Sequence, residues 1–275
     1  MKTTIAVIFD FDDTLAPDST TGLLKNLGVD VDAFWKNVQS MVDGDWDPVP
    51  AYLQAIMEES GKGTVEKITQ KVLSDWGKEV PVFKGASSIF NRLKKHVRGI
   101  DPGIKLEFYL ISSGIGDVIR NTSVAKNFTD IWCCEFAYDD VGEVQALKKV
   151  ISFTDKTRYI FQISKGFVGE SFRGQPFMVN KKIVDGEIRI PFDQMIVVGD
   201  GYTDVPCFSL VRKNGGFTIG VYDRHRPSRW GRAWEFIEDG RVSNLVSADY
   251  SSRSDLSNVL VMALESIVRR ITEGK

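Results

Sequence analysis

The sequence predicts an α/β fold in which a doubly wound, mostly parallel sheet carries an inserted all-helical unit. Three observations support this prediction. Short apolar runs that suit buried strands recur along the chain, and amphipathic helical patterns separate them. Polar or acidic residues follow several of these runs directly, and one long helical stretch interrupts the alternation after the first run. Strand, helix and strand in succession imply parallel pairing with right-handed crossovers.

Composition narrows the functional classes. The chain has 275 residues, of which 43% are hydrophobic, so it can bury the core of one large domain or of one domain with an insert. Lys and Arg total 35 against 37 Asp and Glu, a net charge of -2, so no global basic field predicts nucleic acid or an anionic membrane as a partner. The sequence leaves the oligomeric state open.

Cysteine and histidine usage excludes further classes. The three cysteines are an odd number with no C-x-x-C spacing, which argues against a disulfide framework and favours a reducing cytoplasm. The chain has only two histidines, which argues against a histidine-based zinc site and against a serine triad. The first apolar run stops at Asp10, too early for a signal peptide, and no stretch is long enough to span a membrane.

The first expected strand, residues 5–9, leads directly into acidic residues. Asp10, Asp12 and the hydroxyl of Thr14 follow it at alternate positions. Crowded carboxylates repel one another and are costly to desolvate, so we expect a cation or a shared proton to compensate them. The alternative is a solvated acidic turn.

Residues 22–76 show helical spacing without a convincing strand. Glycine and proline breaks near residues 44–45, 48–50 and 61–63 divide the block into short helices. We interpret residues 19–81 as an inserted unit, although peripheral helices of a single domain would give the same pattern. Its aromatic residues Trp35, Trp46 and Tyr52 are expected to pack inside the insert, as aromatic residues at helical spacing commonly do, and the alternative is that they line a substrate pocket.

The remaining elements return to the alternating pattern. The strands expected after the insert are residues 106–111, 131–136, 195–198 and 216–222. The helices expected are residues 86–96, 115–127 and 256–271. An Asp-Gly turn between apolar pairs predicts a small hairpin over residues 183–190.

Several of the polar residues at these boundaries match one known family. Asp10, Asp12 and Thr14 form D-x-D-x-T after an apolar strand, which resembles motif I of the haloacid dehalogenase (HAD) superfamily. Ser112, Lys156 and the pair Asp200 and Asp204 occur in the chain order of the other three motifs. The helical stretch after motif I resembles the type-1 cap of the phosphoserine-phosphatase-like branch. Groups at the carboxyl ends of parallel strands face one crevice, so these residues can converge.

The resemblance implies a HAD-type Rossmann-like core over residues 1–18 and 82–275, a helical cap over residues 19–81, and the activity of a phosphoric monoester hydrolase. It implies that Asp10 is the nucleophile that forms an aspartyl-phosphate and that Asp12 is the general acid and base. It also implies Mg²⁺, held by the side chains of Asp10 and Asp200 and the carbonyl of Asp12. The substrate expected is a small phosphorylated metabolite.

The resemblance assigns roles to the other motif residues as well. Ser112, with backbone N–H groups near Ser113 and Gly114, would bind phosphoryl oxygens, and Thr14 would place its hydroxyl near the phosphoryl group or fix the loop. Lys156 would neutralise phosphoryl charge, and we favour it over Lys165 because it begins a helix. Asp204 would order a metal-bound water, hold Lys156 or cap a helix.

Other functions remain possible at this point. A phosphotransferase of the same superfamily would use the same residues. A receiver-like phosphoacceptor domain also gathers acids, a hydroxyl and a lysine, but it gains nothing from the general acid Asp12 and lacks a helical insert. A dinucleotide site at Gly114 and Gly116 is disfavoured because position 119 is Ile where the fingerprint requires Gly.

Overall fold

The computed structural model describes residues 3–63 and 66–274, and their strands form one sheet in the order β4-β3-β2-β1-β5-β6-β7. The strands are β1 (Thr4–Phe9), β2 (Lys105–Ile115), β3 (Asp130–Tyr138), β4 (Val144–Lys149), β5 (Met195–Gly199), β6 (Phe217–Tyr222) and β7 (Asn244–Ser247). The pair β3 and β4 is antiparallel and the other neighbours are parallel. The predicted α/β fold with a doubly wound, mostly parallel sheet is confirmed.

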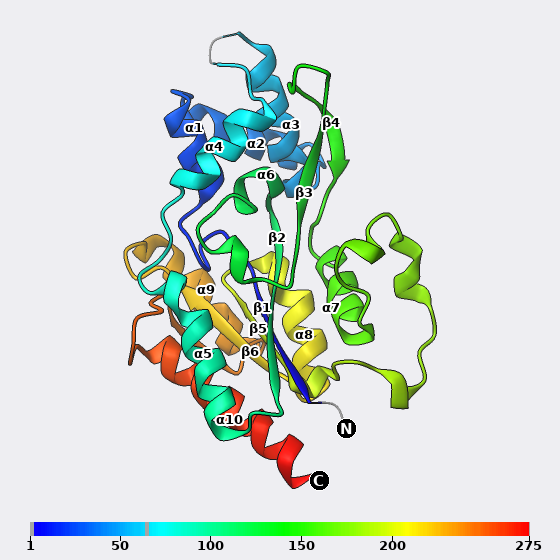
Figure 1. Cartoon of the computed structure of the whole chain (residues 1–275). Helices are drawn as coiled ribbons and strands as arrows, with labels where there is room; N and C mark the ends of the chain where they lie inside the picture. The colour runs from blue at the N-terminus through cyan, green and yellow to red at the C-terminus, as the bar shows by residue number, and fades with distance from the viewer. Residues whose placement is uncertain (1–2, 64–65, 275) are drawn as a thin grey trace.

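Helices cover both sides of this sheet. They are α1 (Ser19–Asn26), α2 (Val31–Asp43), α3 (Pro48–Gly61), α4 (Gln70–Glu79), α5 (Ala86–Ile100), α6 (Gly116–Ile119), α7 (Asp155–Lys165), α8 (Val205–Lys213), α9 (Trp230–Glu238) and α10 (Asp255–Glu273). Figure 1 shows α5 and α10 on one side of the sheet and α7 and α8 on the other. The C-terminal helix α10 buries the apolar stripe that the sequence predicts, which includes Leu260, Leu264 and Ile267.

The helices α1 to α4 follow β1 and precede α5, and we call residues 19–81 the helical insert. Side chains that accept backbone N–H bonds begin three of them: Asp18 caps α1, Asp30 caps α2 and Thr69 caps α4. In Figure 1 the insert lies at the top of the molecule, beside the hairpin of β3 and β4. The N–H of Val144 in β4 donates to the carbonyl of Ile68 at 3.2 Å, so the hairpin and the insert share a backbone hydrogen bond. Whether residues 19–81 form a separate domain stays a prediction.

The hairpin predicted over residues 183–190 is wrong. The segment holds a 3₁₀ turn, Asp185–Glu187, and no strand. The N–H groups of Arg189 and Ile190 both donate to the carbonyl of Ser164 at the end of α7, at 2.9 and 3.0 Å, so the segment is held by α7 instead of pairing with itself. A two-stranded ribbon this short is marginal alone, and these tertiary bonds replace it. The hairpin of the molecule is β3 with β4.

The helix predicted over residues 115–127 is also wrong in most of its length. The strand β2 continues to Ile115, α6 has only four residues, and a 3₁₀ turn follows at Ala125–Asn127. Side chains compete with the helical backbone here, because Asn121 Nδ2 donates to the Asp117 carbonyl and Thr122 Oγ1 donates to the Ile119 carbonyl. Ser112, Ser113 and Gly114 therefore belong to a strand end and not to a helix start.

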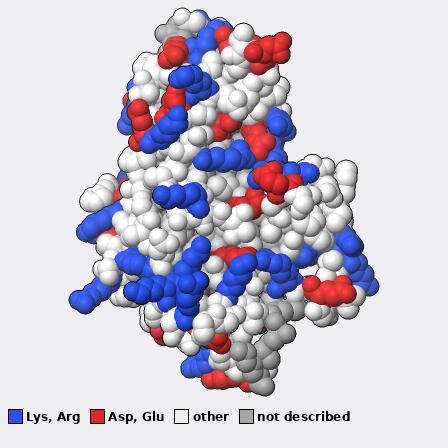
Figure 2. Space-filling view, viewed as in Figure 1, with Lys and Arg blue, Asp and Glu red and all other residues white. Residues whose placement is uncertain are grey.

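The surface and the helices give no further functional class. On the face shown in Figure 2, basic and acidic side chains are mixed over the upper part, whereas Lys and Arg predominate in the lower left part. Among the helices of residues 3–63 and 66–274, none has the length and apolar character needed to cross a bilayer. The three cysteines are buried and free, which agrees with the expectation that they form no disulfide framework.

Candidate active site

The predicted site residues after β1 and β5 lie at the point where the strand order reverses. The strand β1 pairs with β2 on one side and with β5 on the other, with Phe9 beside Leu110 and Val198. The N–H of Asp10 continues this pairing by donating to the Val198 carbonyl at 3.0 Å. Crossovers leave this point toward opposite faces of the sheet, which opens a crevice at the carboxyl ends of the strands. Asp10 and Asp200 both enter that crevice.

Three carboxylates meet there. Asp10, Asp200 and Asp204 each place one oxygen within 4.8 Å of the others, and Asp10 and Asp204 are only 7% and 3% exposed. Burial, then the charges of Asp10 and Asp204, raises the pKa of Asp200 well above its usual value. Burial and the charge of Asp10 raise the pKa of Asp204 to about 7. The cluster therefore resists holding all its negative charges unless a cation compensates them.

Lys156 supplies part of that compensation. Its Nζ lies 2.7 Å from Asp204 Oδ1 and 3.2 Å from Asp10 Oδ2, and its side chain is 1% exposed. Burial alone would lower the pKa of the ammonium, but the nearby carboxylates of Asp10 and Asp204 raise it by more than burial lowers it. The pKa therefore lies above its usual value, and Lys156 stays charged. Lys165, at the other end of α7, donates instead to the carbonyls of Val179 and Lys181. The structure thus brings Lys156, and not Lys165, to the acids.

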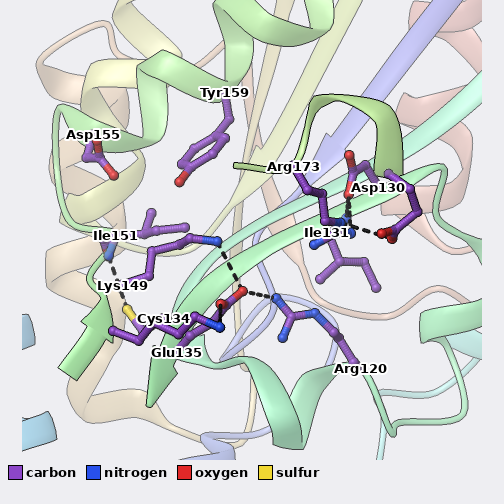
Figure 3. Close-up of polar contacts among 12 residues, drawn as sticks. Arg120, Asp130, Ile131, Cys134, Glu135, Lys149, Ile151, Asp155, Tyr159 and Arg173 are labelled. Carbon is purple, nitrogen blue, oxygen red and sulfur yellow. Dashed lines mark hydrogen bonds and ion pairs between the residues drawn. The ribbon is translucent and has the colours of Figure 1, made fainter. Parts of the chain in front are cut away.

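The loop that delivers Lys156 is anchored by the hairpin of β3 and β4. Figure 3 shows Glu135 of β3 between Arg120 and Lys149, whose nitrogens lie 2.5 and 3.1 Å from Glu135 Oε1. The sulfur of Cys134 accepts a hydrogen bond at 3.2 Å from the N–H of Ile151, four residues before α7 begins. These contacts fix the path from β4 into the helix, so the first turn of α7 points Lys156 at the crevice.

Asp12 lies in the loop after β1, and its environment favours the neutral acid. Its Oδ1 accepts from the N–H of Ser19 at 2.7 Å. Burial, then the charge of Asp18, raises its pKa to about 8. A Cβ at Gly114 would lie 2.5 Å from Asp12 Oδ2, so only glycine lets β2 approach this carboxyl group. Asp12 can therefore donate a proton at neutral pH.

Thr14 and Asp13 stabilise the loop in ways that the motif alone does not specify. Thr14 is fully buried, and its hydroxyl donates to Asp200 Oδ1 at 3.5 Å. It is not among the residues that line the cavity described next. Asp13 has a φ of 52° and accepts from Arg226 Nη1 at 2.8 Å. No sequence pattern indicates the pair of Asp13 and Arg226, which joins loops more than two hundred residues apart.

A cavity of about 200 Å³ opens between these strand ends and the helical insert. The described residues that line it are Asp10, Asp12, Asp13, Asp18, Thr20, Trp35, Tyr52, Ser112, Ser113, Gly114, Asp200 and Thr203. Ser112 Oγ accepts from the N–H of Gly114 at 3.0 Å, which leaves its own proton available to a ligand. A second cavity of about 240 Å³ lies between β3 and α7, and none of the clustered carboxylates lines it.

The insert contributes residues to this cavity that the sequence analysis assigned to packing. Tyr52 donates its hydroxyl proton to the Ser113 carbonyl at 2.5 Å, and Trp35 Nε1 donates to Thr21 Oγ1 at 3.0 Å. Their rings lie 6.3 Å apart and both reach the cavity. Asp18 and Thr20 also line it, and the only signal for them in the sequence is that they directly follow the acidic loop.

Comparisons with known proteins match this architecture. A HAD family hydrolase from Salmonella enterica serovar Typhi superposes with a TM-score of 0.60 over 95% of this chain and 71% of that one, at 11% identity. A phosphoserine phosphatase, in a phospho-aspartyl intermediate analogue, superposes with a TM-score of 0.57 over 94% of this chain and 98% of its own, at 15% identity. The chain has the HAD hydrolase fold. The resemblance noted in the sequence is thereby confirmed at the level of the fold.

Sequence comparison adds one relative of the HAD-fold chain. An uncharacterized protein of Borreliella burgdorferi is 25% identical over 280 residues, which span 92% of this chain and 94% of that protein. No family model matches. A probable phosphoserine phosphatase from Vibrio cholerae has the same fold with a TM-score of 0.58 and 12% identity, and this chain covers 67% of it.

The donor set of the HAD-fold crevice suits a hard divalent cation. Asp10 Oδ1 is buried and, among the described residues, has no hydrogen-bond partner, while Asp10 Oδ2 faces Lys156. Asp200 is the third acid of the cluster, and Lys156 pairs with the other two. Carboxylate oxygens with room for water are the ligands that Mg²⁺ prefers. The residues therefore fit a Mg²⁺ site, with Asp204 turned toward Lys156.

Proposed function

We propose that this protein is a Mg²⁺-dependent phosphatase that hydrolyses a small phosphomonoester through an aspartyl-phosphate on Asp10. One observation carries the proposal: a buried carboxylate, held by Lys156 on one oxygen and unpaired on the other among the described residues, faces a cavity that is also lined by Asp12, whose pKa burial raises. A carboxylate nucleophile and a separate carboxylic acid are what transfer of a phosphoryl group to Asp10 requires.

In the first step a carboxylate oxygen of Asp10 bonds to phosphorus while the bond from phosphorus to the ester oxygen breaks. The leaving alkoxide takes the proton of Asp12, since an unprotonated alkoxide is a poor leaving group. Lys156 lies close to Asp10 and offsets negative charge near the phosphoryl oxygens. Ser112 donates its free hydroxyl proton to one of them. The products of this step are the alcohol and the phosphorylated Asp10.

In the second step Asp12, now a carboxylate, accepts a proton from a water molecule that attacks the same phosphorus atom. The bond between phosphorus and Asp10 breaks, which restores the Asp10 carboxylate and releases inorganic phosphate. Mg²⁺ held by Asp10 and Asp200 would neutralise negative charge on the phosphoryl group. The residues of the helical insert would limit access of bulk water, and we propose residues 19–81 as the functional cap of the core.

The test is Asp10→Asn, assayed with p-nitrophenyl phosphate and a panel of phosphorylated sugars, amino acids and nucleotides at saturating Mg²⁺. We expect turnover to fall by about a thousandfold or more, since the nucleophile is lost. Asp32→Asn, which removes an exposed carboxylate at the start of α2, is the matched control. Hydrolysis by Asp10→Asn at the wild-type rate would refute the covalent mechanism.

A second measurement separates a phosphatase from a receiver-like domain or a phosphotransferase. Mass spectrometry of acid-quenched protein should find a phosphoryl adduct on the peptide that contains Asp10, and it should decay within the turnover time. An adduct that lasts for minutes would favour a receiver, because Asp12 beside the nucleophile should accelerate hydrolysis. Phosphate appearing on an added alcohol instead of in solution would favour phosphotransfer.

A further inference from the structure

We propose that the substrate is a phosphorylated amino alcohol without a carboxylate, and that its ammonium group binds against Trp35, Tyr52 and Asp18. This inference rests on the phosphatase function proposed above and names its substrate class. The helical insert contributes two aromatic residues to the cavity, Asp18 lies just before the insert as the cap of α1, and the ends of the sheet strands carry the reacting groups.

The charge of the cavity wall excludes an anionic leaving group. Five of the twelve described residues that line the cavity are aspartates, and none of these twelve is a lysine or an arginine. The cations nearby are already engaged, because Lys156 faces Asp10 and Asp204 and Arg226 faces Asp13. At the leaving-group end, away from the expected metal, a carboxylate on the substrate would meet Asp18 and no lysine or arginine of the cavity wall, which opposes its binding.

The aromatic pair favours a cationic leaving group. The polar ends of both rings are engaged, Trp35 Nε1 with Thr21 and the Tyr52 hydroxyl with the Ser113 carbonyl, so the rings offer the cavity mainly their apolar surface. The two rings are inclined at 44° with centroids 6.3 Å apart. Ring faces attract ammonium groups through their quadrupole, and indole does so most strongly.

Asp18 adds a fixed negative charge beside the rings. Its Oδ1 accepts from the N–H of Thr21 at 2.9 Å and its Oδ2 accepts from the Thr21 hydroxyl at 2.7 Å, so the carboxylate is held rigidly as the cap of α1. Thr21 also accepts from Trp35, which places the acid and the indole in one hydrogen-bonded unit. This unit combines an aromatic surface with an anion, as an ammonium site requires.

The cavity size limits the rest of the substrate. Its volume of about 200 Å³ lies below the range of about 300–1,000 Å³ that is typical of drug-sized ligands. A phosphoryl group with a short two-carbon amino alcohol suits this space, and a nucleotide does not. Phosphocholine and phosphoethanolamine are therefore suitable probes of this class.

The test compares two substrates that differ in one atom. Phosphocholine and 3,3-dimethylbutyl phosphate have the same shape, but the second has carbon in place of the charged nitrogen. We expect kcat/KM for phosphocholine to be about tenfold higher, which corresponds to about 1.4 kcal/mol and lies within the range of a desolvated cation and aromatic contact. Phosphoethanolamine should likewise exceed phosphoserine, which adds a carboxylate to the same framework.

A variant locates the preference on Asp18. Asp18→Asn keeps an oxygen for the helix cap but removes the charge, so the ratio of kcat/KM for phosphocholine over 3,3-dimethylbutyl phosphate should fall about threefold or more. The ratio cancels effects on Asp12, because both substrates react at the same phosphorus atom with the same acid. Asp32→Asn, the exposed control at the start of α2, should leave the ratio unchanged.

The outcomes separate this inference from the proposed function. Equal kcat/KM for phosphocholine and its neutral analogue, or a preference for phosphoserine over phosphoethanolamine, would overturn the substrate class while leaving a phosphatase. A ratio that Asp18→Asn does not lower would overturn the role of Asp18. Failure to hydrolyse any monoester, p-nitrophenyl phosphate included, would refute the phosphatase function and this inference with it.

Discussion

Replacing Lys156 by methionine tests the electrostatic design of the site most directly. Methionine keeps most of the volume of the lysine side chain, so the packing of the buried position changes little. The substitution leaves the buried carboxylates of Asp10 and Asp204 without their shared cation. We therefore expect both stability and activity to fall.

The expected loss of stability follows from the geometry. At an effective dielectric constant of about 20, charges at 3.2 and 2.7 Å attract by about 5 and 6 kcal/mol. Desolvation of three buried ions cancels much of this attraction. Removing one partner of such a buried pair costs about 3–5 kcal/mol, because the remaining charge stays buried and uncompensated. We expect Lys156→Met to lower the free energy of unfolding by that amount at pH 7.

The assay is urea unfolding followed by the fluorescence of the six tryptophans, with EDTA present so that metal binding does not compensate the acids. The double variant Lys156→Met with Asp204→Asn should recover part of the loss, since it removes one of the uncompensated charges. Lys36→Met, at an exposed position of α2, is the control and should change stability by less than about 0.5 kcal/mol. A Lys156→Met protein as stable as the wild type, or a double variant with no recovery, would refute the reasoning.

Three further predictions concern the same crevice. Burial and the charge of Asp18 raise the pKa of Asp12 to about 8, so kcat/KM should decline as the pH rises above about 8. Asp18→Asn should move that decline to lower pH. An unchanged pH profile in this variant would contradict the role of Asp12 as the general acid. Gly114→Ala places a Cβ 2.5 Å from Asp12 Oδ2, so kcat should fall by about a hundredfold with an unchanged far-ultraviolet circular dichroism spectrum. Lys165→Met should keep kcat within about twofold. It removes two hydrogen bonds to carbonyls, so urea unfolding should show a loss of about 1–3 kcal/mol of stability. A loss of activity equal to that of Lys156→Met would contradict the choice of Lys156 over Lys165.

The sequence predicts the sheet core well because each central strand has a local signature. Residues 5–9 and 195–198 are apolar runs that end at acids, and in the structure β1 and β5 pair with Phe9 beside Val198. The local sequence pattern predicts the wrong element where contacts with residues distant in the sequence determine the structure. The segment 183–190 has the composition of a hairpin, yet its N–H groups bond to the end of α7. The strand β4 lies at the sheet edge, and its sequence VQALKK mixes three apolar residues with polar and charged ones, so it has no continuous apolar run that would predict a buried strand.

The same distinction applies to the site. The motif positions Asp10, Asp200 and Lys156 can be found from the sequence because each follows a strand or begins a helix, and the fold brings such positions together. The cavity residues of the insert cannot be found from the sequence in this way. Trp35 and Tyr52 have the helical spacing of packing residues. Only the structure, in which Tyr52 of α3 bonds to Ser113 of β2 and both aromatic residues line the cavity, shows their second role.

The electrostatics of the crevice connect its metal, its acid and its substrate. Among the described residues, Lys156 and Arg226 each offset an acid of the crevice, and the cluster of Asp10, Asp200 and Asp204 still has more negative charge than these cations balance. A phosphoryl dianion cannot approach such a surface until other positive charge is present. A divalent cation between Asp10 and Asp200 and the proton on Asp12 supply it at the reacting end, and an ammonium group on the leaving alcohol would supply it beside Asp18. The excess of negative charge thus accounts for the expected metal and the proposed preference for a cationic substrate, and together with burial it raises the pKa of Asp12.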